Sequence, residues 1–186
     1  MSDRDARALL AGLAAGEESA FAELHVQFGT RLFRCAHRML GHAQDAEEVV
    51  QEVFFSLVRS RDRLLQVDNL PGYLFTALRH AAQRYRTRQP RTHTSPDVLS
   101  DMANPPASIS KEVDAELEHA LRMLPTEQRE VLAMKIDGEL TFAEIGRVLQ
   151  ISPHTAASRY RYALQKLRGI LTGDVSAVPT AMRKLP

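Results

Sequence analysis

Several residue types are scarce in this chain of 186 residues, which has no tryptophan, one cysteine, nine glycines and nine prolines. A single thiol, Cys35, permits no intramolecular disulfide, so the sequence does not indicate an oxidising compartment. Free cysteine is usually buried, and Cys35 lies in an apolar helical pattern, so we interpret it as a small core residue. The low glycine and proline content excludes a low-complexity polymer.

Long apolar segments are missing as well. No stretch approaches the ~20 apolar residues that cross a membrane. The first five residues, MSDRD, contain acids and lead into no long apolar run, unlike a signal peptide. We therefore expect a cytoplasmic protein.

Motifs of catalysis and metal binding are also absent from the sequence. The seven histidines show no Cys/His spacing of a zinc site. Residues 116–119, ELEH, form a lone Glu-x-x-His, whereas a di-iron bundle needs two such motifs and further carboxylates. There is no phosphate-binding glycine loop and no nucleophile elbow. We expect neither an enzyme nor a cofactor.

The net charge of +1 conceals three segments of strongly unequal charge. Residues 79–96 contain five arginines, two histidines and no acid, and residues 153–173 contain three arginines, one lysine and no acid. Residues 45–52 contain four acids and no base. This layout indicates a polyanionic partner and a second, different partner.

Apolar residues recur at spacings of three and four throughout, which predicts an all-α fold. Between residues 89 and 110 the periodicity stops among four prolines, which indicates a linker that could span tens of ångströms at ~3 Å per residue. The predicted domains are 1–88 and 113–172, with a flexible linker at 89–112 and a tail at 173–186. The predicted helices cover residues 3–14, 18–40, 45–63, 73–87, 111–123, 126–136, 141–149 and 152–171.

The last two predicted helices form a helix-turn-helix. Thr141 and Glu144 match a capping box, and Ser152 places a capping hydroxyl before Pro153. Two capped helices on so short a turn must cross steeply. The alternatives are a plain hairpin with a solvated basic face and a membrane-surface helix. The second helix is expected to bury Ala156, Tyr160, Ala163, Leu164, Leu167 and Leu171. Its candidate DNA-binding residues are His154, Thr155, Ser158, Arg159, Arg161, Tyr162, Gln165 and Lys166.

These segments resemble the extracytoplasmic-function sigma factors of bacterial RNA polymerase. Residues 124–132 (LPTEQREVL), 138–146 (GELTFAEIG), 151–155 (ISPHT) and 158–161 (SRYR) are similar to sigma region four, which binds the minus-35 promoter element. Residues 45–54 (DAEEVVQEVF) are similar to the region-two helix that docks on polymerase. Residues 73–80 (YLFTALRH), with the arginines that follow, are similar to the part that handles the minus-10 element.

The resemblance implies two further sets of site residues. It also places the loop 67–72 where the family holds an unstacked base. Tyr73 stands where the family commonly has tryptophan, and Ala156 and Ala157 replace a bulky apolar and a basic residue. The implied polymerase-binding residues are Asp45, Glu48, Val49, Gln51, Glu52 and Phe54. The implied DNA-binding residues are Arg79, His80, Gln83, Arg84, Arg86 and Arg88.

We therefore predict a sigma factor that directs core RNA polymerase to promoters and binds both duplex and melted promoter DNA. An anti-sigma factor is an expected further partner. The alternatives are a stand-alone helix-turn-helix regulator and a helical adaptor protein. Specific promoter opening only in the presence of polymerase distinguishes the first from the other two.

Overall fold

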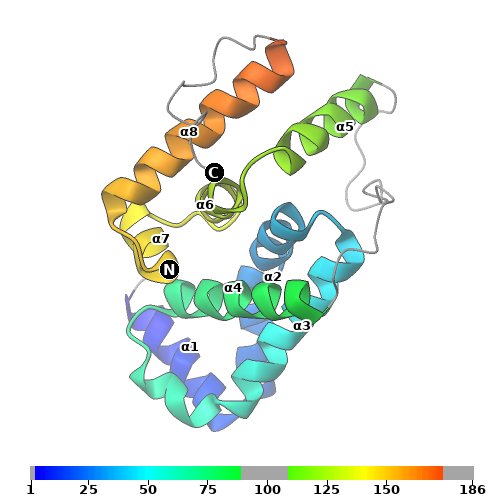
Figure 1. Cartoon of the computed structure of the whole chain (residues 1–186). Coiled ribbons are helices and arrows are strands. Elements are labelled where there is room, and N and C mark those ends of the chain that lie inside the picture. Colours follow the sequence, from blue (N-terminus) through cyan, green and yellow to red (C-terminus); the bar gives the residue numbers. More distant parts are fainter. Residues whose placement is uncertain (1–2, 89–108, 174–186) are drawn as a thin grey trace.

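The computed structural model describes residues 3–88 and 109–173. Every regular element in these ranges is helical, which confirms the all-α prediction, and the chain forms two helical parts (Figure 1). The predicted linker lies outside the described residues as far as residue 108, and residues 109–112 belong to a helix. None of the described helices is long and apolar enough to cross a membrane. The first part contains α1 (Asp3–Ala15), α2 (Glu18–Leu40), α3 (Ala43–Arg59), the 3₁₀ helix η1 (Arg61–Gln66) and α4 (Leu70–Arg88). The second part contains α5 (Ile109–Arg122), α6 (Thr126–Ile136), α7 (Phe142–Leu149) and α8 (Pro153–Thr172).

Helix α2 shows how the apolar pattern builds the first part. Its apolar residues at spacings of three and four face the core, and Leu24, Leu32 and Cys35 are fully inaccessible to solvent. The helix stops at Gly41, which adopts a left-handed φ of 89° and donates its N–H to the carbonyl of His37 at 2.7 Å. Glycine adopts this conformation without the Cβ clash of other residues. The buried thiol of Cys35 confirms its interpretation as a core residue.

The start of α4 differs from the prediction. The predicted helix begins at residue 73, after the loop 67–72, but the helix in the structure already begins at Leu70. The side chain of Asn69 accepts a hydrogen bond from the backbone N–H of Gly72 at 2.7 Å and so acts as a cap. Pro71 fits the first turn because its missing N–H would have no helical partner there. The predicted 67–72 loop is therefore shorter, since its last three residues are helical.

The second part contains the predicted helix-turn-helix. The capping box is present. The carboxylate of Glu144 accepts a hydrogen bond from the backbone N–H of Thr141 at 2.8 Å, and the hydroxyl of Thr141 accepts one from the backbone N–H of Glu144 at 3.2 Å. In the turn, Gln150 has a left-handed φ of 57°, and Ile151 donates its N–H to the carbonyl of Gly146 at 2.9 Å. A Cβ on Gly146 would lie 2.8 Å from the carbonyl oxygen of Ile151. Only glycine permits this close approach of turn and helix.

Helix α8 buries a narrower stripe than predicted. Ala156 and Ala163 are fully buried and Leu167 is 8% exposed, because these residues face α5, α6 and α7. Leu164 and Leu171 were predicted to face inward, but they are 42% and 45% exposed. The neighbouring helices cover the line that runs from Ala156 through Ala163 and Leu167, and Leu164 and Leu171 lie off this line.

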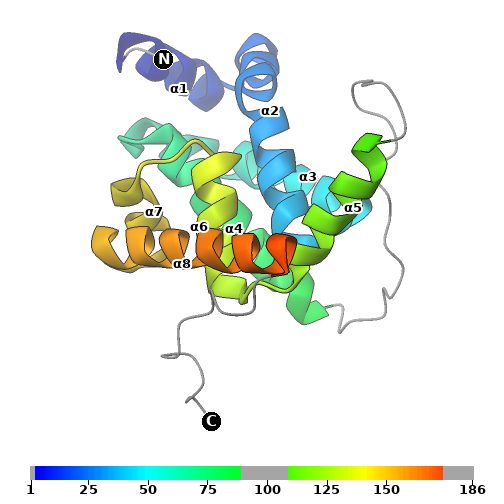
Figure 2. The same cartoon turned by 90° about the horizontal axis from the view of Figure 1, so that it is seen from above.

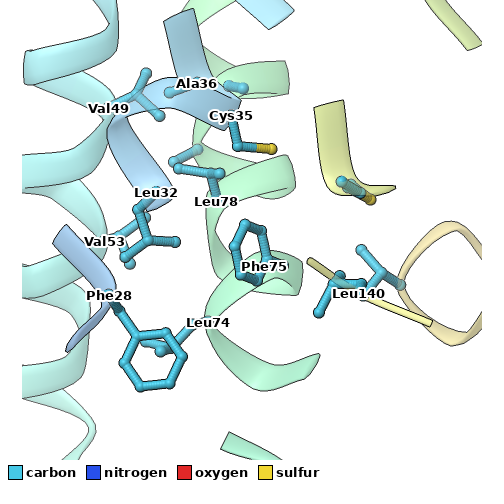
Figure 3. Close-up of a cluster of buried hydrophobic side chains, with 14 of the residues drawn as sticks. Phe28, Leu32, Cys35, Ala36, Val49, Val53, Leu74, Phe75, Leu78 and Leu140 are labelled. Carbon is cyan, nitrogen blue, oxygen red and sulfur yellow. The ribbon is translucent and has the colours of Figure 1, made fainter. Parts of the chain in front are cut away.

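The two parts pack directly against each other. Phe75 of α4 is fully buried, and Figure 3 shows its ring between the side chains of α2 and α3 and that of Leu140. One core cluster runs through both parts and also includes Met134 and Val148 of the second part. Contacts of α2 with α6 and of α4 with α7 make this junction. The sequence predicted two domains on a flexible linker and gave no prediction of how they are placed relative to each other.

Helix α5 belongs to the second part but does not close this junction completely. It packs on α8 through a smaller cluster that contains Ala120, Leu121 and Leu167. A groove of about 700 Å³ separates it from α2 and α3, with Phe33 and Val50 on one side and Leu117 on the other. Figure 2 shows α5 and α8 meeting near their C-terminal ends. The contacts between the two parts are thus concentrated at α6 and α7.

Candidate nucleic-acid interface

The outer face of α8 presents the predicted DNA-binding residues in two adjacent rows. Helical spacings of three and four place residues 154, 158, 161 and 165 in one row and residues 155, 159, 162 and 166 in the next. His154, Arg161, Tyr162 and Gln165 are exposed, and the other four are half-buried. The structure therefore brings all eight onto one continuous face. The first turn of α8 contains no acid, so its exposed backbone donors favour an anion.

Two contacts fix side chains on this face. The guanidinium of Arg159 lies 2.7 Å from the carboxylate of Glu127, at the start of α6. Arg161 lies over the ring of Tyr162, 5.7 Å from its centroid. The Ser152 hydroxyl caps the helix by accepting the N–H of Thr155 at 3.0 Å. Most of the face remains open to solvent.

Helix α4 divides its predicted DNA-binding residues between two sides. His80, Gln83, Arg84 and Arg88 are exposed on the outer side and line a shallow hollow. Thr87 lines the same hollow and was not predicted, although its spacing of four from Gln83 places it on this face. Arg79 and Arg86 are half-buried and turn toward the second part.

The inner side of α4 meets an acid of α6. The carboxylate of Glu130 lies 3.2 Å from Nη1 of Arg86 and 3.8 Å from Nε of Arg79. Its side chain is 8% exposed, whereas those of Arg79 and Arg86 are 21% and 30% exposed. Arg86 also donates to the carbonyl of Met39 at 2.7 Å, and Arg79 donates to that of Val148 at 3.3 Å. Both guanidinium groups are thus engaged within the protein.

Helix α3 carries the predicted polymerase-binding residues, and the structure separates them by depth. Glu48 and Gln51 are exposed, and Glu52 is half-buried, 2.8 Å from Nη2 of Arg84. Val49 is fully buried in the core and presents no surface to a partner. Phe54 is half-buried, with its ring centroid 5.5 Å from that of His25.

Asp45 has a structural contact that the sequence did not reveal. It is 9% exposed and accepts a hydrogen bond from the hydroxyl of Tyr85 at 2.6 Å. Burial, followed by this hydrogen bond and the charge of Asp45, raises the pKa of Tyr85 above its ordinary value. Asp45 therefore ties α3 to α4 instead of facing outward.

Sequence reasoning missed one exposed aromatic on the same face of α3. Phe55 is 64% exposed, and Val58, three residues later, is 47% exposed. Phe55 follows Gln51 by four positions, so the two share a face. The helical spacing alone would have identified Phe55, had the resemblance not drawn attention to Phe54.

The chain thus combines an acidic helical face on α3, an arginine-bearing helix α4 and a capped helix-turn-helix, in this order. Residues 24–92 match Sigma-70 region 2, and residues 114–167 match Sigma-70 region 4. The first match spans α3 and α4, and the second contains the helix-turn-helix.

Relatives narrow the class further. The chain is 31% identical over 176 residues to the ECF RNA polymerase sigma factor SigK of Mycobacterium ulcerans, covering 90% of this chain and 94% of SigK. The chain belongs to the ECF sigma factors of the sigma-70 family. It directs RNA polymerase to promoters as a non-enzymatic initiation factor, which confirms the prediction over the stand-alone regulator.

Solved structures share this fold. CnrH, in complex with the cytosolic domain of CnrY, superposes with a TM-score of 0.68 at 23% identity, over 90% of this chain and 97% of CnrH. The sigma factor RpoE from Bartonella quintana, in complex with the anti-sigma factor NepR, gives a TM-score of 0.66 at 21% identity, over 83% of this chain and 98% of RpoE. At this identity the two likenesses support the fold.

Proposed function

We propose that α8 reads the minus-35 duplex through its two outward rows. The supporting observation is one continuous face of eight polar, cationic and aromatic side chains on a helix whose first turn has no acid. A helix fits the major groove, where arginine and glutamine reach base edges. Arg161 and Gln165 are exposed in the first of the two rows and are the leading candidates for base contacts.

The outer side of α4 supplies a second DNA surface in this proposal. His80, Arg84 and Arg88 are exposed in one hollow and suit the phosphates of a melted minus-10 strand. The arginines need no sequence-specific geometry for this task, because phosphate contacts position a strand without reading it.

The exposed face of α3 docks on core polymerase in the same proposal. Glu48 and Gln51 are exposed there beside Phe55, so the face offers charge around an apolar centre. Asp45 and Val49 support this face from behind. A basic surface on the polymerase would complement the acids.

Run-off transcription with purified core polymerase tests this division of tasks. Glu48→Lys should abolish promoter-specific transcripts and recovery of polymerase in a pull-down, while helical content stays unchanged. Glu23→Lys, an equal charge reversal at an exposed position of α2, is the matched control and should transcribe as the unmodified chain does. Normal transcription by Glu48→Lys would remove α3 from the docking surface.

We also propose a cytoplasmic location and an anti-sigma partner. The location follows from the tasks, since polymerase and promoter DNA are encountered there. The partner is proposed because the similar RpoE of Bartonella quintana was crystallised with the anti-sigma factor NepR. Copurification of a protein that suppresses run-off transcription would support this partner, and its absence under every growth condition would count against it.

A further inference from the structure

The groove of about 700 Å³ between α2, α3 and α5 has the size and lining of a small-molecule site. Its surface is mostly apolar, with Phe33 of α2, Val50 of α3, and Leu117 and Leu121 of α5 in the lining. Sites for small molecules typically measure about 300–1,000 Å³ and are lined by apolar and aromatic side chains with a few polar groups. The DNA-binding residues proposed on α4 and α8, all of which the structure describes, are not part of this lining.

A glycine in the middle of α2 keeps part of the groove open. Gly29 lines the groove, and the three atoms nearest to a Cβ added there all belong to the ring of His25, at 3.4–3.5 Å. Gly29 lies within a regular helix and has no positive φ, so its backbone does not require glycine. Glycine also weakens a helix relative to alanine. What its missing side chain provides is free space in the groove.

One arginine of the lining is not engaged by an acid. Arg38 pairs with Asp137, and Arg122 lies 3.6 Å from Glu118. Arg34 is exposed and has no hydrogen bond or ion pair within the ranges that the structure describes. A guanidinium binds a carboxylate or a sulfonate through two parallel hydrogen bonds. An unpaired guanidinium beside an apolar surface therefore favours a ligand with an anionic group on an apolar body.

The other polar groups leave a small excess of positive charge around the groove. Burial lowers the pKa of His37, with Glu118 acting in the opposite direction. Its neutral ring stacks on Phe33, with the two centroids 6.1 Å apart, and adds aromatic surface. Glu47 of α3 is exposed in the same lining and would oppose a bound anion. The charged residues of the lining are Arg34, Arg38, Arg122, Arg129, Glu47, Glu118 and Asp137.

The dimensions of the groove favour a small molecule over a polypeptide helix. A helix of three turns is about 16 Å long and about 10 Å wide, so it fills about 1,250 Å³. The groove measures about 700 Å³ and encloses only part of such a segment. A compact amphipathic molecule can instead place its whole apolar body between α2 and α5.

We propose that the groove between α2, α3 and α5 binds a small amphipathic anion, a carboxylate on an aromatic or medium-chain aliphatic body. Phe33, Val50 and Leu117 surround the apolar body, and Arg34 binds the carboxylate. The inference goes beyond the proposed function, because it uses none of the DNA-binding residues. Gln51 lines the groove and also belongs to the proposed docking face of α3, so the bound anion lies next to the surface that meets polymerase.

Fluorescence titration of the full chain tests the site with two probes that share an aromatic body. Anilinonaphthalene sulfonate carries a negative charge, phenylnaphthylamine is neutral, and the emission of both rises in apolar surroundings. The unmodified chain should bind the sulfonate at a single saturable site with a Kd of about 10–100 µM, the range expected for a ligand of this size. Decanoate, an aliphatic carboxylate, should displace it.

Two charge variants should act in opposite directions on the sulfonate alone. Arg34→Gln should raise its Kd about fivefold, and Glu47→Gln should lower it about twofold, since both groups are exposed and partly screened. The Kd of the neutral probe should change in neither variant. Arg59→Gln removes another exposed charge, at the end of α3 and outside the groove, and should leave both Kd values unchanged.

A variant that fills the groove should weaken binding of both probes. Gly29→Leu places a side chain in the free space and should raise both Kd values about tenfold or more. Leu117→Glu, at a position that is 37% exposed, decides the question if Gly29→Leu loses helical content. Val26→Ser removes an apolar side chain that is 81% exposed and outside the groove, and it should bind both probes as the unmodified chain does.

Three results would overturn the site. These are no saturable binding of the sulfonate to the unmodified chain, equal behaviour of Arg34→Gln and Arg59→Gln, and unchanged Kd values in both Gly29→Leu and Leu117→Glu. If the unmodified chain bound neither probe but Gly29→Leu lost a copurifying partner protein, the groove would belong to a polypeptide instead.

Discussion

Helices α4 and α8 carry the same kind of residues, arginines in acid-free stretches of sequence, but meet different surroundings. On α8 the arginine-bearing face is open, and Glu127, which pairs with Arg159 there, is 67% exposed. On α4 half of the arginines turn into the junction, where Glu130 is buried beside them. An exposed ion pair contributes little and is readily exchanged for a phosphate, whereas a buried carboxylate is not easily released.

This difference shows that the charge of the local sequence does not determine whether an arginine is free to bind DNA. On α4, Glu130 pairs with Arg86, 44 positions earlier in the chain, and with Arg79, 51 positions earlier. Both ion pairs depend on how α6 packs against the first part. The face of α8 depends on caps within three residues of the helix start. We therefore expect variants of α8 to change DNA binding directly and inner variants of α4 to act through the junction.

The largest effect is expected for a substitution at Gly146 of α7, which packs against the turn that leads into α8. A Cβ there would lie 2.8 Å from the carbonyl oxygen of Ile151 and 3.3 Å from the nitrogen of Pro153, both backbone atoms. Gly146→Ala should lower the free energy of unfolding by about 1–3 kcal/mol and abolish binding to the minus-35 duplex, because the turn can no longer approach the helix. Urea unfolding and gel shifts with polymerase measure the two effects.

Gly29→Ala is the matched control for that variant. A Cβ at Gly29 would be 3.4 Å from the nearest atom, a carbon of His25, which is an ordinary contact. Alanine also favours the helix by up to about 1 kcal/mol over glycine. This variant should be at least as stable as the unmodified chain. Equal behaviour of the two variants would show that the close approach at Gly146 has no role.

Two single substitutions, one on each helix, test the difference between α8 and α4. Arg161→Ala removes an exposed side chain, so stability should change by less than about 0.5 kcal/mol while minus-35 binding weakens by about 1–3 kcal/mol. Arg86→Ala should lower the free energy of unfolding by about 1–3 kcal/mol, because it loses the bonds to Met39 and Glu130. Thermal unfolding and duplex binding are measured for both. Similar profiles for the two variants would contradict the distinction between an open and an engaged face.

The sequence predicted the parts of the fold that depend on near neighbours. The capping box at Thr141, the cap at Ser152 and the end of the predicted helix 18–40 each involve residues three or four apart, and all are present. The outward rows of α8 follow from the same helical spacing. In each of these cases the residues that form the sequence pattern and the contacts that it predicts lie within one helical turn.

Contacts over long separations were beyond this kind of prediction. The sequence predicts Asp45 as part of an acidic surface, but in the structure its carboxylate accepts a hydrogen bond from the hydroxyl of Tyr85, 40 positions away. The start of α4 was misplaced because Pro71 and Gly72 signal a turn, and the capping side chain of Asn69 reverses that signal. The junction itself has no sequence signature, since Glu130 and Asp137 resemble ordinary surface acids of a polar helix.

A smaller effect is expected at the pair that links the two outer surfaces, Glu52 of α3 and Arg84 of α4. Their side chains are 27% and 48% exposed, so water screens the attraction. A double-mutant cycle with Glu52→Gln and Arg84→Gln should give a coupling of about 0–1 kcal/mol that vanishes in high salt. The same cycle on Glu130 and Arg86 should give a larger coupling that persists. Reversed values would remove the contrast between open and engaged arginines.

The smallest expected effect is a pH dependence at Glu144, where α7 meets the first part through Asn69. Burial pushes the pKa of Glu144 upward, but hydrogen bonds from the backbone and side chain of Thr141, and from Asn69, outweigh this and lower the pKa below its ordinary value. A carboxyl with a lowered pKa in the folded state stabilises the fold at pH above its unfolded value. That contribution is lost as the pH falls through the folded value.

Glu144→Gln should therefore cost about 0.5–1 kcal/mol at neutral pH, the typical effect of a weakened cap, and progressively less in acid. Urea unfolding of both proteins from neutral to acidic pH measures the difference. Asn69→Ala should reduce it without removing it, because the bonds from Thr141 remain. If the difference in unfolding free energy between the two proteins did not depend on pH, the effect would come from altered packing of the side chain rather than from its charge. A difference that disappears entirely with Asn69→Ala would make the cap a property of the junction, and α7 would then belong with α4 among the elements that depend on distant neighbours.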